Sequence, residues 1–259
     1  MHAAEREVLI LDAISLTGFV SYRDLEARLD ASPATIRRDL ARLESQGRLH
    51  RLRGGARLPG HSQTGQPNGL TGTPFEKSLA LHRVEKSAIG KCAAALCQPG
   101  EGIMIDGGST TFQMCEHLAG LNLQVLTNSL HIVNALLPQE GTTILVPSGA
   151  VFREQNIILA PGGEESMPRF HASKLFLGAA AVGSQGIMQA DAILVASQRR
   201  LIERADEVIL LVDSGKFASS SGAIVCELDD IDTLVTDRGL AAESRAMAEG
   251  AGLKVIIAE

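Results

Sequence analysis

The chain has 259 residues, enough for one or two domains with a large buried core. It contains no run of about eighteen apolar residues and no signal peptide, so a soluble cytoplasmic protein without a membrane partner is expected. A chain with no tryptophan and one tyrosine is poorly suited to binding single-stranded nucleic acid by base stacking. The net charge of −6 means that the chain as a whole is acidic, so a DNA-binding surface could be only a local basic region.

The chain begins with two predicted helices. The first is predicted over residues 7–16, where Val8, Leu11 and Ile14 recur at helical spacing. The second is predicted to begin at Ser21, because serine is a favoured cap whose side chain accepts from the backbone of the first turn. Only a tight turn separates its end from a third helix.

The third helix combines a clear start, a buried stripe and an arginine-rich outer face. Ser32 is a suitable cap, and Pro33 suits the first helical position. The stripe follows from apolar residues at i, i+4 and i+7, which are Ile36, Leu40 and Leu43. Arg38 lies opposite this stripe, and its like charge four residues from Arg42 costs an isolated helix roughly 0.2–0.5 kcal/mol. Such a face is either solvated or covered by a polyanion.

A short arginine-rich hairpin is predicted after this helix. Residues 48–56 read R-L-H-R-L-R-G-G-A, so alternate side chains would project from one face of the hairpin. Helix, tight turn and a second helix with a serine cap form a helix-turn-helix, and the hairpin would be the wing of a winged helix. This arrangement favours DNA binding over a merely solvated arginine face.

The charge distribution agrees with a DNA-binding amino-terminal domain. Residues 1–60 contain ten arginines, no lysine and eight acidic residues, whereas the remainder has 14 basic and 22 acidic residues. The positive charge is therefore local, and DNA affinity is expected to fall steeply with salt.

The motif S-P-A-T-I-R-R-D-L at 32–40, followed by G-x-L-x-R-x-x-G-G-A at 47–56, resembles the DeoR family of bacterial repressors. The resemblance covers residues 5–57 and implies a winged helix-turn-helix that reads double-stranded operator DNA. The expected DNA-binding residues are Ser21, Tyr22, Ser32, Ala34, Thr35, Arg37, Arg38, Arg42, Arg48, His50, Arg51 and Arg53.

The sequence predicts three parts: a DNA-binding domain over 1–58, a flexible linker over 59–74 rich in Gly, Pro and polar residues, and an α/β domain over 75–259. In the last part helical and strand patterns alternate, which predicts a mostly parallel sheet covered on both faces. Strands are expected at 102–105, 123–126, 143–146, 175–179, 208–212, 233–235 and 253–257, and helices at 84–96, 111–118, through 132–136, and at 192–205 and 241–249.

Polar residues follow four of these predicted strands, at the sheet edge where α/β proteins bind ligands. The richest cluster is D-G-G-S-T-T at 106–111, whose glycines and hydroxyls suit close approach to an anion; a plain strand-to-helix turn would also use such residues. The other clusters follow the strands ending near residues 127, 212 and 236. The expected effector-binding residues are Asp106, Gly107, Gly108, Ser109, Thr110, Thr111, Asn128, Ser129, Asp213 and Lys216.

This second part also resembles the DeoR-family effector domain, whose fold resembles ribose-phosphate isomerase. The resemblance rests on E-K at 85–86, D-G-G-S-T-T, T-N-S at 127–129, V-D-S-G-K-F at 212–217 and T-D at 236–237, and it implies a sugar or sugar-phosphate inducer. Where the family has Gly-Gly after the strand at 143–146, this chain has Ser148-Gly149, so no contact is carried over from that loop. Residues 151–160 and 172–178 resemble repressors of deoxysugar catabolism, such as rhamnose, and more distantly ascorbate regulators.

Two functions are compatible with these patterns. The first is a homo-oligomeric repressor, a dimer or a tetramer, released from its operator by a sugar or sugar phosphate. The second is a sugar-phosphate isomerase, for which Asp106, Asp213 and Lys216 are available, but that function leaves the arginine-rich helix without a role. The four cysteines show no zinc-ligand spacing, so neither a metal nor a cofactor is expected.

Overall fold

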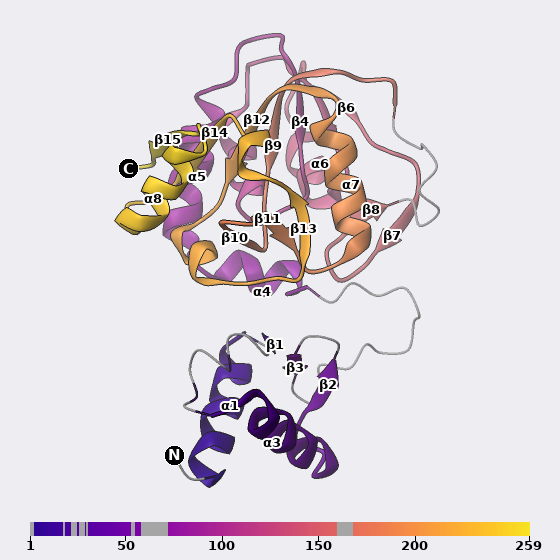
Figure 1. Ribbon diagram of the computed structural model, residues 1–259. Helices are drawn as coiled ribbons and strands as arrows, with labels where there is room; N and C mark the ends of the chain where they lie inside the picture. The colour runs from indigo at the N-terminus through magenta and orange to yellow at the C-terminus, as the bar shows by residue number, and fades with distance from the viewer. Residues whose placement is uncertain are drawn as a thin grey trace. The chain divides into compact units, whose positions relative to one another are not determined.

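The computed structural model describes residues 3–17, 19–21, 25, 29, 31–52, 55–57, 72–159 and 168–259. The chain divides into two compact units, Met1–Pro67 and Asn68–Glu259, shown with their elements in Figure 1. The division falls inside 59–74, whose role as a linker stays a prediction because most of that segment lies outside the described residues.

The amino-terminal unit contains two long helices and a small antiparallel sheet among its described residues. Its elements are α1 (Ala3–Thr17), β1 (Phe19–Ser21), α3 (Pro33–Ser45), β2 (His50–Leu52) and β3 (Gly55–Arg57). β3 lies between β1 and β2 and pairs antiparallel with both. The predicted third helix and the predicted hairpin are therefore confirmed as α3 and β2–β3.

The core of this unit joins both helices to the sheet. Its fully buried side chains come from α1, α3, β3 and the turn before β2, and include Ile10, Ile14, Ile36, Leu40, Leu43, Leu49 and Ala56. Val8, which the predicted stripe of the first helix included, is 56% exposed, and the buried face of α1 instead passes through Ile10 and Ile14. Two overlapping apolar stripes exist on this helix, and packing against α3 selects the second.

Part of the predicted second helix lies outside the described residues. Leu25 and Leu29 are described and buried, and the Leu29 amide donates to the Leu25 carbonyl at 2.8 Å, the spacing of one helical turn. Ser21 is the last residue of β1 and pairs with Gly55. An N-cap residue has an extended backbone and precedes the helix, so this place in β1 is compatible with the predicted cap, which stays a prediction because residues 22–24 lie outside the described residues.

The carboxy-terminal unit is built on a parallel sheet of seven described strands. Their order is β15-β14-β12-β9-β4-β5-β6, and every neighbouring pair is parallel. The strands are β4 (Gly102–Ile105), β5 (Gln124–Thr127), β6 (Thr143–Leu145), β9 (Ala172–Leu177), β12 (Ala205–Leu211), β14 (Thr233–Thr236) and β15 (Lys254–Ile257). The predicted α/β fold with a mostly parallel sheet is confirmed.

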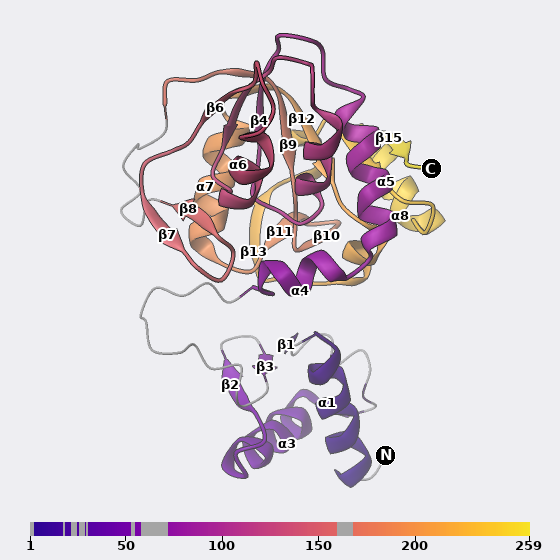
Figure 2. The ribbon, with the colours of Figure 1, turned by 180° about the vertical axis from the view of Figure 1, so that it is seen from behind.

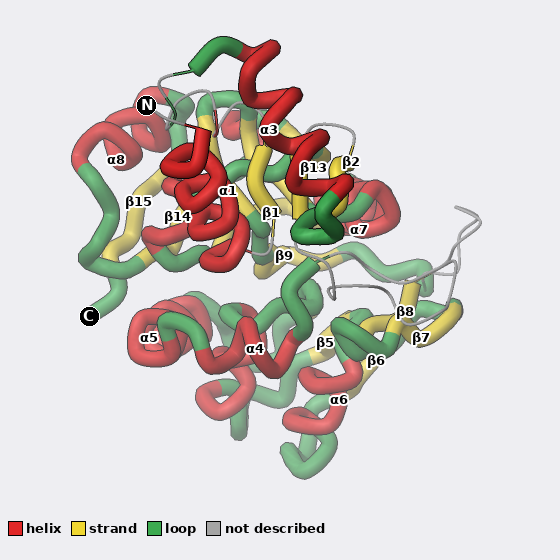
Figure 3. The backbone as a smooth tube through the Cα atoms, turned by 90° about the horizontal axis from the view of Figure 1, so that it is seen from below, coloured by secondary structure: helices red, strands yellow, loops and turns green. Residues whose placement is uncertain are grey.

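Helices cover both faces of this sheet, as Figure 3 shows from one end. The described helices are α4 (Phe75–Ala80), α5 (Arg83–Ala94), α6 (Leu130–Leu136), α7 (Ala192–Ile202) and α8 (Ala242–Gly250), with 3₁₀ turns η1 (Thr111–His117), η2 (Ser214–Ala218) and η3 (Leu228–Asp230). The predicted helix at 111–118 is thus a 3₁₀ helix. None of the described helices is long and apolar enough to cross a membrane.

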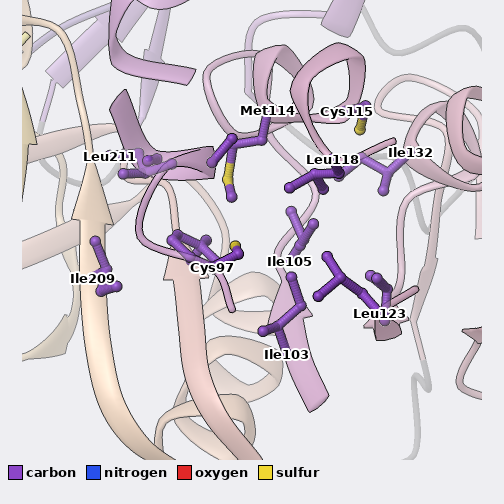
Figure 4. Packing of buried hydrophobic residues seen from close by; sticks show 14 of the residues in the cluster. Cys97, Ile103, Ile105, Met114, Cys115, Leu118, Leu123, Ile132, Ile209 and Leu211 are labelled. Atoms are coloured by element: carbon purple, nitrogen blue, oxygen red, sulfur yellow. The ribbon is translucent and has the colours of Figure 1, made fainter. Parts of the chain in front are cut away.

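Two hydrophobic cores lie on opposite faces of the sheet. Ile103 and Ile105 of β4 pack with α5, η1 and α6 in the core shown in Figure 4, whereas Met104, between them, packs with α7 and α8 on the other face. Ile209 and Leu210 of β12 divide in the same way. Because successive side chains of a strand point to opposite faces, a strand buried on both faces must be apolar throughout.

Five short strands of the carboxy-terminal unit were not predicted, and neither was β1. The hairpin β7–β8 (Ala150–Phe152 and Ile157–Leu159) and the small sheet β10-β11-β13 (Ala181–Gly183, Gly186–Gln189 and Ala223–Cys226) consist of strands of three or four residues. Such strands carry too few residues for a periodic pattern, and they form because a tertiary partner is present.

The order of strands reverses between β4 and β9. Strands β4, β5 and β6 follow one another toward one side of the sheet, and β9, β12, β14 and β15 follow one another toward the other. Loops at the carboxyl ends of β4 and β9 therefore diverge, and a crevice outside this point is where open α/β sheets bind ligands.

Candidate functional site

The candidate DNA-binding surface begins at the start of α3. Ser32 has an extended backbone conformation, and its hydroxyl oxygen accepts from the Thr35 amide at 3.3 Å and lies 2.9 Å from the Thr35 hydroxyl. Pro33 occupies the first turn. The predicted cap is confirmed, and it sets the direction of the helix.

Arg37 and Arg38 are exposed on the side of α3 away from its buried stripe. Within the described residues neither guanidinium has an ion-pair partner, and Ala34 beside them is exposed as well. A pair of unpaired guanidinium groups on an open helix face can reach phosphate oxygens and base edges, which is the arrangement that DNA recognition requires.

Arg42 has different surroundings from Arg38. Its guanidinium lies 3.1 Å from the carboxylate of Asp39 and 2.5 Å from that of Glu7 on α1. Asp39 is buried and also accepts two hydrogen bonds from Arg6 of α1, at 2.7 and 3.3 Å. These ion pairs fasten α3 to α1, so Arg42 contributes to holding the helix in place.

The wing is attached to α3 by a second set of contacts. Arg51 donates its backbone amide to Glu44 at 2.9 Å, and its guanidinium lies 3.3 Å from the same carboxylate. Arg48 lies 3.9 Å from Glu7, and His50 is exposed. Arg53, Tyr22 and the side chain of Ser21 lie outside the described residues.

The second candidate site lies at the carboxyl edge of the parallel sheet. The predicted polar clusters follow β4, β5, β12 and β14, and parallel pairing brings the ends of these strands to one edge. Asp106, directly after β4, is buried, and its carboxylate accepts from Gln198 of α7 at 2.6 Å. Burial raises the pKa of Asp106, although the hydrogen bonds from Gln198 and from the backbone of Gly107 and Gly178 act in the opposite direction.

Gly107 and Asn128 fix the shape of the loop after β4. The Gly107 amide donates to the side-chain oxygen of Asn128 at 3.0 Å. A Cβ atom at position 107 would lie only 2.7 Å from the Ile157 side chain, so no larger residue fits. At Gly107 the close approach is to the protein's own β8 strand, and the expected approach to an anion stays a prediction.

The hydroxyl groups predicted to bind the effector differ in what they contact. Thr111 is fully buried and donates to the Asp106 carbonyl at 2.7 Å, and Ser129 caps α6 by accepting from the Ile132 amide at 3.4 Å. Ser109 instead contacts the Ser78 hydroxyl of α4 at 2.9 Å. Thr110 is also buried, and Gly108 is half-buried.

Two lysines and an aspartate form the charged part of this edge. Lys86 of α5 is almost completely buried and donates to the Ser78 carbonyl at 2.5 Å. Burial lowers the pKa of Lys86 to about 8; the nearby charge of Asp213 opposes this shift, and that of Lys216 adds to it. The three groups are therefore close enough to interact electrostatically.

Asp237 supports the loop that carries Lys216. Its carboxylate accepts from the Ser214 amide at 2.6 Å, the Ser214 hydroxyl at 2.9 Å and the Gly239 amide at 2.8 Å. Burial tends to raise the pKa of Asp237, but these hydrogen bonds outweigh it and lower the pKa. Asp237 is thus an ionised anchor for η2.

Three unsatisfied polar atoms gather at the same edge. Among the described residues, five buried side-chain atoms lack a hydrogen-bond partner, and three of them belong to Gln198, Asp213 and Thr236. An unpaired buried polar atom costs about 1–3 kcal/mol, so a cluster of them is unusual in a region that serves stability alone.

Lys86, Gln198 and Ser78 were not among the predicted site residues. Lys86 is aligned at i, i+3 and i+7 with the buried Ile89 and Ala93, and Gln198 lies between the buried Val195 and Leu201. A polar residue on an apolar helical stripe is a signal that could have identified both. Ser78 has no comparable sequence signal.

Both units match models of one protein family. Residues 6–61 match the DeoR-like helix-turn-helix domain, and residues 81–238 match the DeoR C terminal sensor domain. The chain is 28% identical over 256 residues to proteins named HTH-type transcriptional regulator UlaR from Shigella dysenteriae serotype 1 and from Salmonella arizonae, and the alignment covers 99% of this chain and of each relative.

Solved structures with similar parts have much lower identity. Ribose 5-phosphate isomerase A from Methanocaldococcus jannaschii is 16% identical with a TM-score of 0.37, over 51% of this chain and about half (53%) of that one. A probable sor operon regulator from Shigella flexneri is 7% identical with a TM-score of 0.37, over 68% of this chain and 86% of that one. Likenesses at this level say nothing about activity.

The helix-turn-helix model covers the unit that contains α3, and the sensor model covers the unit that contains the polar sheet edge. The sensor model alone spans more than half of the chain. The chain therefore belongs to the DeoR family of transcriptional regulators, with a helix-turn-helix domain followed by a sensor domain.

Proposed function

We propose that this regulator is a repressor of a sugar-catabolism operon and that a sugar phosphate releases it from its operator. The effector would bind at the carboxyl edge of the parallel sheet. The observation that carries this proposal is the group of buried, unpaired atoms of Gln198, Asp213 and Thr236 beside two lysines.

The chemistry of the edge favours a phosphorylated sugar over a neutral one. Lys86 and Lys216 supply two ammonium groups for a phosphate, and charge-assisted hydrogen bonds of this kind are roughly twice as strong as neutral ones. Asp213 and Gln198 offer oxygen atoms that accept from sugar hydroxyls. A neutral sugar offers no negative charge to these two ammonium groups.

In the amino-terminal domain, α3 would enter the major groove with Arg37 and Arg38 toward the DNA, while the wing contacts the phosphate backbone through Arg48 and His50. A homo-oligomer with two-fold symmetry, a dimer or a tetramer, would match a palindromic operator. An effector that prefers the non-binding state about 10⁴-fold, near 5.5 kcal/mol, would shift occupancy from 99:1 to 1:99.

The proposal is tested by a gel shift with DNA from the region upstream of the protein's own gene. The experiment is repeated with pentose phosphates, hexose phosphates and the corresponding free sugars, including deoxysugars such as rhamnose. We expect a shifted band that disappears with one sugar phosphate and persists with its free sugar. Release by the free sugar alone would contradict the phosphate specificity, and isomerisation of a sugar phosphate without any DNA binding would reject the repressor altogether.

A further inference from the structure

Helix α4 occupies the groups that the effector is proposed to need. The Ser78 hydroxyl lies 2.9 Å from the Ser109 hydroxyl, and the Ser78 carbonyl accepts from the Lys86 ammonium at 2.5 Å. One residue of α4 therefore engages both the D-G-G-S-T-T loop after β4 and the buried lysine of α5. Figure 2 shows α4 across one edge of the sheet, beside α5.

The rest of α4 is held by contacts outside this edge. Phe75 stacks on His131 of α6, with ring centroids 3.8 Å apart, and meets Phe112 edge-on at 5.7 Å. The Phe75 amide donates to the Glu154 carbonyl at 3.2 Å. A six-residue helix is not stable by itself, so α4 stays helical only while such contacts hold it.

The hydrogen bond between Lys86 and Ser78 is replaceable. The Ser78 carbonyl is neutral, whereas an ammonium group bonds more strongly to an anionic oxygen. Asp213 is a nearby opposite charge, but Lys216, close to the same point, adds a second positive charge. An incoming phosphate would therefore compete well for the ammonium group.

We propose that Ser78 is a built-in competitor of the effector, and that an anionic ligand which takes Ser109 and Lys86 displaces α4 from the sheet edge. This inference rests on the proposed function, since it concerns the same effector site. Because α4 begins directly after the segment that leads from the DNA-binding domain, its displacement is the change that the effector transmits along the chain.

If Ser78 competes with the effector, removing its hydroxyl should raise the affinity for the effector. Ser78→Ala removes the hydroxyl contact with Ser109 and so weakens the competitor, which raises the population that can bind the effector. We expect the sugar phosphate identified by gel shift to bind Ser78→Ala about three- to tenfold more tightly than wild type, the factor that one ordinary hydrogen bond supplies. The matched control is Ser87→Ala, at a partly buried serine next to Lys86 on α5, with no expected change.

Isothermal titration calorimetry on the full-length protein measures these affinities. If Ser78 instead contacts the effector, Ser78→Ala will bind it more weakly, and if Ser78 is only structural, the affinity will match that of Ser87→Ala. Either result overturns the inference.

Hydrogen exchange tests the displacement itself. With the same sugar phosphate at saturation, amide exchange across residues 75–80 should become faster than in the free protein, because the helix loses the two contacts of Ser78 with Ser109 and Lys86. Slower or unchanged exchange would show α4 closing over the ligand or staying in place, and would refute the inference while leaving the proposed function intact. If no sugar phosphate binds at all, the proposed function fails and the inference fails with it.

Discussion

Arginines of the DNA-binding domain divide by what they contact. Arg42, Arg48 and Arg51 each lie beside a carboxylate of the same domain, whereas Arg37 and Arg38 face outward without an ion pair among the described residues. The contacts of the first group orient α3 and the wing, so among the described arginine side chains of this domain Arg37 and Arg38 can reach DNA without giving up an ion pair.

Arg38→Ala should therefore abolish operator binding and leave stability unchanged. As an exposed substitution it should alter the free energy of unfolding by less than about 0.5 kcal/mol. Fluorescence anisotropy with labelled operator and thermal unfolding measure the two effects. The control Arg245→Ala removes the same charge from the surface of α8 and should bind DNA normally. An Arg38→Ala protein that unfolds readily would show that the residue is structural.

Lys86 makes stability depend on pH in a defined direction. Its pKa is about 8 in the folded protein and 10.5 ordinarily, so between these values the unfolded chain holds a proton that the folded protein has released. The free energy of unfolding contributed by this group therefore rises from about pH 8 to pH 10.5. Lys86→Met removes the titrating group.

Urea denaturation of wild type and Lys86→Met across this pH range should show the wild type gaining stability relative to the variant as the pH rises. The comparison between the two proteins cancels the other groups that titrate there. Parallel curves would mean that the Lys86 ammonium is not destabilised by burial.

At the scale of elements, α5 and η1 approach each other closely enough to exclude a side chain. A Cβ atom at Gly90 of α5 would lie 2.5 Å from the Gln113 Cβ and 2.6 Å from its backbone carbon. Backbone-to-backbone contact of this kind holds Lys86, one turn earlier on α5, beside the loop after β4.

Gly90→Ala should lower the free energy of unfolding by about 1–3 kcal/mol, as overpacked cores do. This loss should occur even though alanine is favoured over glycine within helices by about 0.8–1.0 kcal/mol. Gly250→Ala in α8 is the control, because its added Cβ would meet no atom within 4 Å beyond its chain neighbours and its own helix backbone. Equal stability of the two variants in urea would contradict the close contact.

Local signals explain which elements the sequence could predict. The start of α3 depends on Ser32, Pro33 and a stripe of apolar residues within one helix, so it was predictable. The strands β7, β8, β10 and β11 form two local hairpins of three- or four-residue strands, which are too short for a periodic pattern, and β13 depends on β11, a partner far away in the chain. The choice of buried face on α1 likewise depends on what α3 places against it.

The candidate effector site was predictable in position but not in detail. Parallel strands bring their carboxyl ends together, so the residues after β4, β5, β12 and β14 had to lie at one edge. Which hydroxyls are committed to the protein's own backbone, as those of Thr111 and Ser129 are, depends on the loops as folded. Ser78 reaches the site because contacts of α4 with distant segments, such as the stack of Phe75 on His131, place it there.

At the scale of the molecule, two units with separate cores carry opposite charge. Residues 1–60 contain ten arginines and eight acidic residues, whereas the remainder contains 14 basic and 22 acidic residues. The acidic excess of the sensor domain disfavours its contact with DNA, so DNA affinity should come from the amino-terminal domain. DNA binding and effector binding should then be separable by mutation.

The most direct measurement is a titration of the protein–operator complex with the releasing sugar phosphate, followed by fluorescence anisotropy. Lys216→Ala should bind the operator as wild type does but require at least about tenfold more ligand for release, since it lacks a charge-assisted contact. Lys254→Ala, which removes an exposed charge at the start of β15, should behave as wild type. Release of Lys216→Ala at the wild-type ligand concentration would contradict an effector site at the carboxyl edge of the sheet.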